Sequence, residues 1–229
     1  MIEDGVLRQR MWRFAVHWQY RLFKRRRYGR LVLEDLDGLP LVVLPRVFNP
    51  KLLRSGHFLV QQLRRRELLP PASRVLDLGT GSGAGAVAAA RKGCRVVAVD
   101  INPEAVRCAT INALLNHVES HVETRQGDLF VPVADERFDV ILFNPPFYVG
   151  APRDPLDAAW RSLDVPERFS RGLAAHLTDG AHALLVLSSD GVAERFLNAL
   201  HTQQFQTTLV AQHDFHNEQM VLYRVARAC

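Results

Sequence analysis

From residue 74 onward, short apolar runs alternate with segments of helical periodicity, and this alternation is the strongest constraint on the fold. Most of the runs are uninterrupted, which is typical of strands buried on both faces of a sheet. Strands are expected near 75–78, 95–99, 121–125, 138–143, 183–187, 207–211 and 220–225. Helices are expected over 84–92, 103–116, 166–177 and 192–200. The alternation predicts an α/β, Rossmann-like and doubly wound fold around a mostly parallel, seven-stranded sheet.

The last two expected strands are separated by the polar segment 213–218. A connection this short favours a hairpin, because parallel neighbours need a longer crossover. The sheet should therefore contain an antiparallel strand near the C-terminus.

Residues 1–45 are expected to form an N-terminal unit ahead of the main domain, predicted over 46–229. Apolar residues at helical spacing predict an amphipathic helix over 6–23, whose aromatic residues include Trp12, Trp18 and Tyr20. These rings either dock the helix on the rest of the protein or belong to a lid over a bound ligand. Residues 31–44, with Asp37-Gly38 near their centre, favour a hairpin.

The formal net charge of +5 is concentrated at the N-terminus. Residues 1–30 hold nine Lys and Arg against two acids, so residues 31–229 carry a net charge of −2. A basic arm of this kind binds nucleic acid or an acidic partner, or is simply solvated. The three cysteines lack C-x-x-C spacing and support neither disulfides nor a zinc site, and no 18-residue apolar stretch is present. These features predict a cytoplasmic protein that needs neither a membrane nor a metal.

A glycine-rich turn follows the expected strand 75–78, with Asp77 at its start and glycines at Gly79, Gly81 and Gly83. Glycine lets the backbone adopt unusual dihedral angles and approach a ligand closely. Asp100 ends the next strand, where a carboxylate can accept hydrogen bonds from both hydroxyls of a ribose. Taken alone, this pattern is equally compatible with a dinucleotide-binding G-x-G-x-x-G/A motif.

Asn144-Pro145-Pro146-Phe147 follows the expected strand 138–143. The Asn144 side-chain oxygen and the Pro145 carbonyl can accept both N–H groups of a planar amide or amine and direct its lone pair. Pro146 stiffens the turn, and Phe147 offers a ring face for stacking. The two motifs together indicate transfer chemistry at a nitrogen.

With these motifs, the span from about 48 to 224 resembles the class I S-adenosylmethionine-dependent methyltransferases of the N-P-P-[FY] branch, and most of all the short HemK-like methyltransferases. The resemblance makes 46–229 a catalytic domain that binds S-adenosylmethionine as methyl donor. It implies that Asn144 and the Pro145 carbonyl hold the target nitrogen. It assigns the cofactor to Asp77, Gly79, Thr80, Gly81, Gly83, Asp100, Ile101, Asp128, Leu129 and Asn144, with Asp128 and Leu129 at the adenine.

The methyl acceptor stays open between a protein glutamine, a small molecule and RNA, including an amino group of ribosomal RNA. An alternative is that S-adenosylmethionine is the sole substrate. Its own α-amine, held by Asn144 and Pro145, would then displace methylthioadenosine and form azetidine-2-carboxylate. Some HemK-like relatives need a small activator subunit, and nothing in this sequence indicates one.

Overall fold

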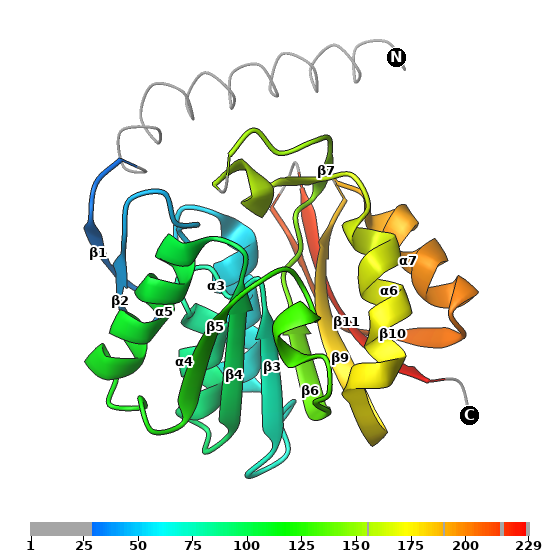
Figure 1. Ribbon diagram of the computed structural model, residues 1–229, viewed down its shortest axis with the longest axis horizontal. Helices are drawn as coiled ribbons and strands as arrows, with labels where there is room; N and C mark the ends of the chain where they lie inside the picture. Colours follow the sequence, from blue (N-terminus) through cyan, green and yellow to red (C-terminus); the bar gives the residue numbers. More distant parts are fainter. Residues whose placement is uncertain (1–28, 155, 190, 216–217, 228–229) are drawn as a thin grey trace.

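The computed structural model describes residues 29–154, 156–189, 191–215 and 218–227. The helix predicted over 6–23, with Trp12, Trp18 and Tyr20, lies outside the described residues, so its function as a lid or a docking arm stays a prediction. Seven strands form one sheet in the order β10-β11-β9-β6-β3-β4-β5 (Figure 1). Their bounds are β3 Arg74–Leu78, β4 Arg95–Asp100, β5 Val122–Gln126, β6 Phe138–Phe143, β9 Leu177–Ser188, β10 Phe205–Asp214 and β11 Gln219–Arg227.

The pairing confirms the predicted α/β fold. Strands β3, β4, β5, β6 and β9 pair in parallel, whereas β11 runs antiparallel to both of its neighbours, β9 and β10. After β5 the chain returns to place β6 on the other side of β3. Because the strand order reverses between β3 and β6, the carboxyl ends of these two strands flank the expected ligand crevice.

Helices cover both faces of the sheet (Figure 1). Their bounds are α3 Arg54–Arg65, α4 Ala84–Ala90, α5 Pro103–Leu115, α6 Val165–His176 and α7 Ala193–Thr202. Within β6, Val140 and Leu142 pack in a core cluster with α3 and α4, while Ile141 and Phe143 pack in a second cluster with α6 and α7. Burial on both faces explains why the strand reads as a continuous apolar run.

The strand expected at 183–187 is longer than predicted, since β9 already begins at Leu177. Its first half contains Thr178-Asp179-Gly180, which reads as a turn, yet Leu177 pairs with Phe138 of β6. Four short elements were not predicted: the parallel pair of β7 (Tyr148–Val149) and β8 (Arg161–Ser162), and the 3₁₀ turns at Val131–Val133 and Asp157–Ala159. Over the part of the chain that the structure covers, no helix combines the length and the apolar character needed to cross a bilayer.

The hairpin expected at 31–44 is present as β1 (Val32–Asp35) and β2 (Pro40–Val43). It is tied to the segment that precedes α3, because the side chain of Asn49 donates a hydrogen bond to Glu34 Oε1 at 3.0 Å. Asn49 Oδ1 also accepts from the amides of Lys51 and Leu52, each at 3.0 Å. This buried asparagine therefore fixes the entry into α3 relative to the hairpin.

Gly83 is required where α4 packs against α5. Its φ is +81°, and a Cβ at this position would lie 2.7 Å from the Ala109 Cα. Gly93 has a similar φ of +84° but open space around it. Both changes to alanine cost about 1 kcal/mol for the dihedral angle, and Gly83→Ala adds about 2 kcal/mol for the clash. We therefore expect urea unfolding to show the larger loss for Gly83→Ala, and equal losses would contradict the close packing.

Candidate active site

A cavity of about 350 Å³ opens at the carboxyl ends of β3, β4, β5 and β6, next to the reversal in strand order. Of the sequence-predicted site residues, those that line it are Asp77, Gly79, Thr80, Gly81, Asp100, Ile101, Asp128, Leu129 and Asn144. Gly83, Pro145 and Phe147 are not among the lining residues. The structure thus brings together residues that are up to 67 positions apart in the chain, from Asp77 to Asn144.

The glycine loop forms the wall after β3. Gly79 and Gly81 have φ values of +62° and +56°, a conformation that strongly favours glycine. The amide of Thr80 donates to the carbonyl of Val99 at 3.0 Å, which ties the loop to β4. Gly83, also predicted as a cofactor contact, lies where α4 packs on α5, as described above.

Asp77 is buried beneath this loop and is 4% exposed. Its Oδ2 accepts from the Thr80 hydroxyl at 2.6 Å and from the Ala86 amide at 2.9 Å. Gly85 makes room for the carboxylate, because a Cβ there would lie 3.0 Å from Asp77 Oδ1. Burial raises the pKa of Asp77 to about 6; the Thr80 and Ala86 hydrogen bonds oppose the rise and the nearby Asp100 adds to it.

Asp100 connects the glycine loop with the start of α5. Its Oδ2 accepts from the Gly81 amide at 2.8 Å and its Oδ1 from the Asn102 amide at 2.9 Å. Each carboxylate oxygen keeps further lone-pair capacity for a ligand hydroxyl. Burial raises the pKa of Asp100, while the backbone hydrogen bonds favour its ionised form.

Asp128 follows β5 and lines the part of the cavity next to this strand. Its Oδ2 accepts from Arg168 at 2.6 Å, and Arg168, from α6, also lines the cavity. Sequence analysis identified the carboxylate but not this arginine partner. The guanidinium group fixes one oxygen of Asp128 and leaves the other to accept a hydrogen bond from a ligand.

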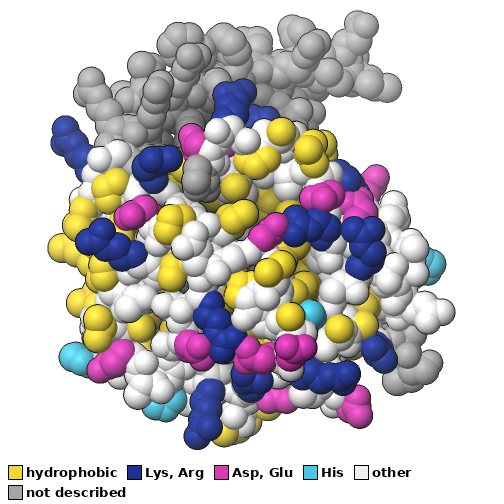
Figure 2. Space-filling model, viewed as in Figure 1, with side chains coloured by type: hydrophobic (Ala, Val, Ile, Leu, Met, Phe, Trp, Pro, Cys, Tyr) yellow, Lys and Arg dark blue, Asp and Glu magenta, His cyan; other side chains and the backbone are white. Residues whose placement is uncertain are grey.

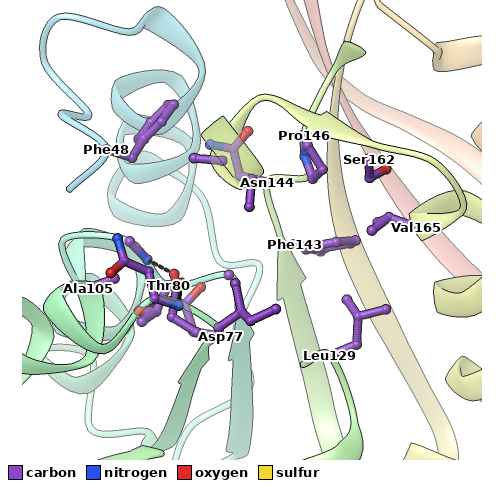
Figure 3. Close-up of a pocket in the computed structure, with 18 of the residues that line it drawn as sticks. Phe48, Asp77, Thr80, Ala105, Leu129, Phe143, Asn144, Pro146, Ser162 and Val165 are labelled. Carbon is purple, nitrogen blue, oxygen red and sulfur yellow. Dashed lines mark hydrogen bonds between the residues drawn. The ribbon is translucent and has the colours of Figure 1, made fainter. Parts of the chain in front are cut away.

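Asn144 follows β6 and projects into the cavity, between Phe48 on one side and Pro146 on the other (Figure 3). Its Nδ2 donates to the Ser55 hydroxyl at 3.2 Å. Its Oδ1 is buried and has no hydrogen-bond partner among the described residues. Leaving a buried acceptor unpaired costs about 1–3 kcal/mol, which a ligand N–H group would recover.

Phe147 does not provide the predicted stacking face at the cavity wall. Its side chain packs against the core cluster that includes α3 and α4. Its carbonyl accepts from the Val192 amide at 3.0 Å, and a Cβ at Gly191 would lie 2.6 Å from the Phe147 carbonyl oxygen. Phe147 therefore anchors the turn to the segment between β9 and α7.

An aromatic ring at the cavity wall is supplied instead by Phe48, which sequence analysis did not select. Its ring lies 6.2 Å from that of Trp160, centroid to centroid. The segment Arg161–Val165, which departs from the HemK-like pattern and was expected near the substrate entrance, also lines the cavity. Neither carries a sequence motif, since a single aromatic residue and a mixed loop are common in any protein.

The charges at the cavity fit a cationic ligand. Among the described residues, four carboxylates line it, from Asp77, Asp100, Asp128 and Asp164, against two guanidinium groups, from Arg161 and Arg168. S-adenosylmethionine carries a sulfonium and an ammonium group against one carboxylate. Together with the glycine loop and the unpaired acceptor on Asn144, this donor set is compatible with that cofactor.

Comparison with known proteins agrees with the geometry. The model of the methyltransferase small domain family matches residues 38–215. A release factor glutamine methyltransferase of Geobacter sulfurreducens is 31% identical over 194 residues, 78% of this chain and 66% of the relative. A candidate protein N5-glutamine methyltransferase of Methanocaldococcus jannaschii is 29% identical over 187 residues, 78% of this chain and 90% of the relative.

Among solved structures, the 16S rRNA N2 G1207 methyltransferase of Thermus thermophilus, in complex with S-adenosylmethionine and guanosine, superposes with a TM-score of 0.60. It is 25% identical, and the match covers 84% of this chain and 49% of that one. The chain thus spans about two thirds of the first relative and about half of the solved protein.

Proposed function

Because the chain belongs to the methyltransferase small domain family and is an S-adenosylmethionine-dependent methyltransferase, we propose that it methylates a nitrogen atom held by Asn144. The observation that carries this proposal is the buried Oδ1 of Asn144, which lacks a hydrogen-bond partner among the described residues. An unpaired acceptor on a residue that lines the cavity selects a target that donates a hydrogen bond. An amide or amine nitrogen is such a target.

The cofactor, when bound, supplies an electrophilic methyl group on a sulfonium. We assign its ribose hydroxyls to Asp100 and its adenine amine to the free oxygen of Asp128, beside Leu129. The carboxylates of Asp77 and the neighbouring Asp100 stabilise the positive charge of the cofactor, which lies on its sulfonium and ammonium groups. These assignments follow from the positions of the residues around one cavity.

Asn144 holds the target nitrogen by accepting one of its N–H groups. The hydrogen bond orients the nitrogen lone pair and increases electron density on a nucleophile that is weak because its lone pair is delocalised. Most of the rate enhancement then comes from holding the nucleophile in line with the transferred methyl group. The nitrogen would attack the methyl carbon as the C–S bond breaks, the sulfur would leave as a neutral thioether, and the methylated nitrogen would then release its proton to water.

Among nitrogen acceptors we propose a glutamine side-chain amide of a protein. Two relatives named for glutamine methylation match 78% of this chain. On the face shown in Figure 2, acidic and basic side chains are interspersed over the described surface, without a continuous basic area. Such a surface favours a neutral acceptor over a polyanion. The basic cluster Arg25-Arg26-Arg27, which would favour RNA, lies outside the described residues.

The test uses the full chain and S-adenosylmethionine labelled in its methyl group, with and without a bacterial cell extract. Products are separated by mass spectrometry into S-adenosylhomocysteine, methylthioadenosine and labelled polymer. We expect S-adenosylhomocysteine to form only with extract, and the labelled polymer to be destroyed by protease but not by ribonuclease. Heat-treated protein is the control.

Two outcomes would contradict the proposal. Label that disappears with ribonuclease and survives protease would identify RNA as the acceptor. Methylthioadenosine released without extract, together with azetidine-2-carboxylate, would show that the cofactor cyclises on its own amine and that no methyl group is transferred.

The raised pKa of Asp77 predicts that cofactor affinity depends on pH. A cationic cofactor binds best to the ionised carboxylate, and below the pKa of about 6 binding must first remove a proton. The affinity for the cofactor is therefore expected to decrease as the pH falls. We expect the dissociation constant of S-adenosylmethionine to rise about fivefold between pH 6 and pH 5, measured by isothermal titration calorimetry.

The matched control is Asp77→Asn, which keeps the shape and one acceptor but cannot ionise. It should bind the cofactor weakly at pH 7 and show little further change down to pH 5. A wild-type protein with a flat profile, or a variant with the same slope as the wild type, would rule out Asp77 as the titrating group.

A further inference from the structure

We propose that Ser55 is a positioning residue for the nitrogen-binding side chain, acting only through its hydrogen bond with Asn144. The inference rests on the proposed function, because it concerns the same Oδ1 acceptor. Ser55 is 2% exposed and is not one of the residues that line the cavity. Its hydroxyl oxygen accepts a hydrogen bond from Asn144 Nδ2 at 3.2 Å, and this contact joins α3 to the turn after β6.

The hydrogen bond holds the Asn144 amide with its Nδ2 on Ser55. In the arrangement shown, one amide N–H is paired with Ser55 and Oδ1 is left as an unpaired acceptor. Turning the amide over would let the hydroxyl donate to Oδ1, which would occupy this acceptor and present the N–H groups in its place. The arrangement shown is therefore the one that can bind a ligand that donates a hydrogen bond. Without the hydroxyl, no hydrogen bond to another described residue holds Nδ2 on the α3 side.

Ser55 is itself held in a fixed place. It lies in the first turn of α3, and the next residue, Gly56, packs so closely on Pro50 that a Cβ there would be 2.7 Å from the Pro50 Cβ. The preceding segment is fixed by Asn49, whose side chain bonds Glu34 of the hairpin. The position of Ser55 is therefore tied to the β1–β2 hairpin through Asn49.

Two cofactor analogues allow a test that needs no methyl acceptor. S-adenosylhomocysteine has a neutral sulfur at the reacting position, whereas sinefungin has a carbon with a protonated amine there, which donates hydrogen bonds. The ratio of their dissociation constants therefore reports an acceptor at the methyl position. We expect the full-length wild type to prefer sinefungin by about tenfold or more.

Ser55→Ala should lower this preference about fivefold and leave the affinity for S-adenosylhomocysteine nearly unchanged. Asn144→Ala should lower it at least as much. If Ser55 acts only through Asn144, the double variant should have the preference of Asn144→Ala alone. Ser55→Thr, which keeps the hydroxyl, should retain the preference, and calorimetry measures all five proteins.

The matched control is Ser170→Ala in α6, a serine that is 1% exposed and whose hydroxyl bonds to carbonyls of its own helix, at Pro166 and Glu167. It should leave the preference unchanged. Ser55→Cys repeats the test with less change in packing, because a thiol is a weak acceptor of similar shape. This variant decides the question if Ser55→Ala does not fold.

An unchanged preference in Ser55→Ala and Ser55→Cys would overturn the proposal, as would additive losses in the double variant. If Asn144→Ala lost the preference and both Ser55 variants kept it, Asn144 would still be the nitrogen-binding residue, but Ser55 would have no part in positioning it. A wild type without any preference for sinefungin would show that Oδ1 does not face the methyl position. That result would overturn the inference about Ser55, whereas failure of the methyltransferase proposal would appear in the labelled products.

Discussion

Replacing Asn144 by alanine is expected to lower the rate of methyl transfer about 100- to 1000-fold while leaving the affinity for S-adenosylmethionine within about threefold. The side chain supplies the buried acceptor that holds the target nitrogen, and alanine removes it without filling the space. The effect should appear in the single-turnover rate measured with the labelled cofactor, because that rate reports the transfer step and not product release.

A matched control is Asn198→Ala, which removes the same side chain from an exposed position on α7. It should keep the wild-type rate. An Asn144→Ala protein that transfers methyl groups at the wild-type rate would exclude Asn144 as the group that holds the nitrogen. A large loss of cofactor affinity together with rate would mean that this asparagine serves the cofactor more than the acceptor.

Asp100→Ala is expected to weaken binding of S-adenosylmethionine about 100-fold or more. The carboxylate is assigned to the ribose, and each hydrogen bond to a charged group contributes about 1.5–3 kcal/mol. It also accepts from the amides of Gly81 and Asn102, so its removal loosens the loop that borders the cofactor. Isothermal titration calorimetry at pH 7.5 measures the change.

Asp135→Ala provides the control, because this carboxylate is exposed and is not among the residues that line the cavity. Its affinity should equal that of the wild type. Thermal unfolding shows whether Asp100→Ala is folded, and so distinguishes the loss of a ligand contact from unfolding of the variant. A folded Asp100→Ala protein with wild-type affinity would contradict the ribose assignment.

The sequence was sufficient to predict most of the fold because the central strands β3, β4 and β6 are buried on both faces. The apolar run at 138–143 coincides with β6, and the strands on either side of it in the sheet begin and end close to their predicted positions, except for the early start of β9. The start of β9 was missed because Thr178-Asp179-Gly180 has turn composition. Pairing with β6 overrides that local preference.

The site was predictable where a residue follows a strand directly. Asp100 and Asn144 end parallel strands, and the carboxyl ends of parallel strands necessarily lie at one edge of the sheet. Ser55 and Phe48 could not be found in this way. The contact between Ser55 and Asn144 joins residues 89 positions apart, and it depends on how α3 packs against the sheet. Tertiary packing also places the partly buried Phe147 against the core cluster that includes α3 and α4.

The small β7–β8 pair has a consequence for how such a protein can diverge. It closes the base of the segment 150–160, because the Tyr148 amide donates to the Trp160 carbonyl at 2.8 Å and the Gly150 amide to the Ser162 carbonyl at 3.1 Å. A loop whose ends are already joined tolerates changes of length at little entropic cost. The segment can therefore change in length, and with it the part of the cavity wall that Pro152, Leu156 and Ala158 form, while the β7–β8 pair stays in place.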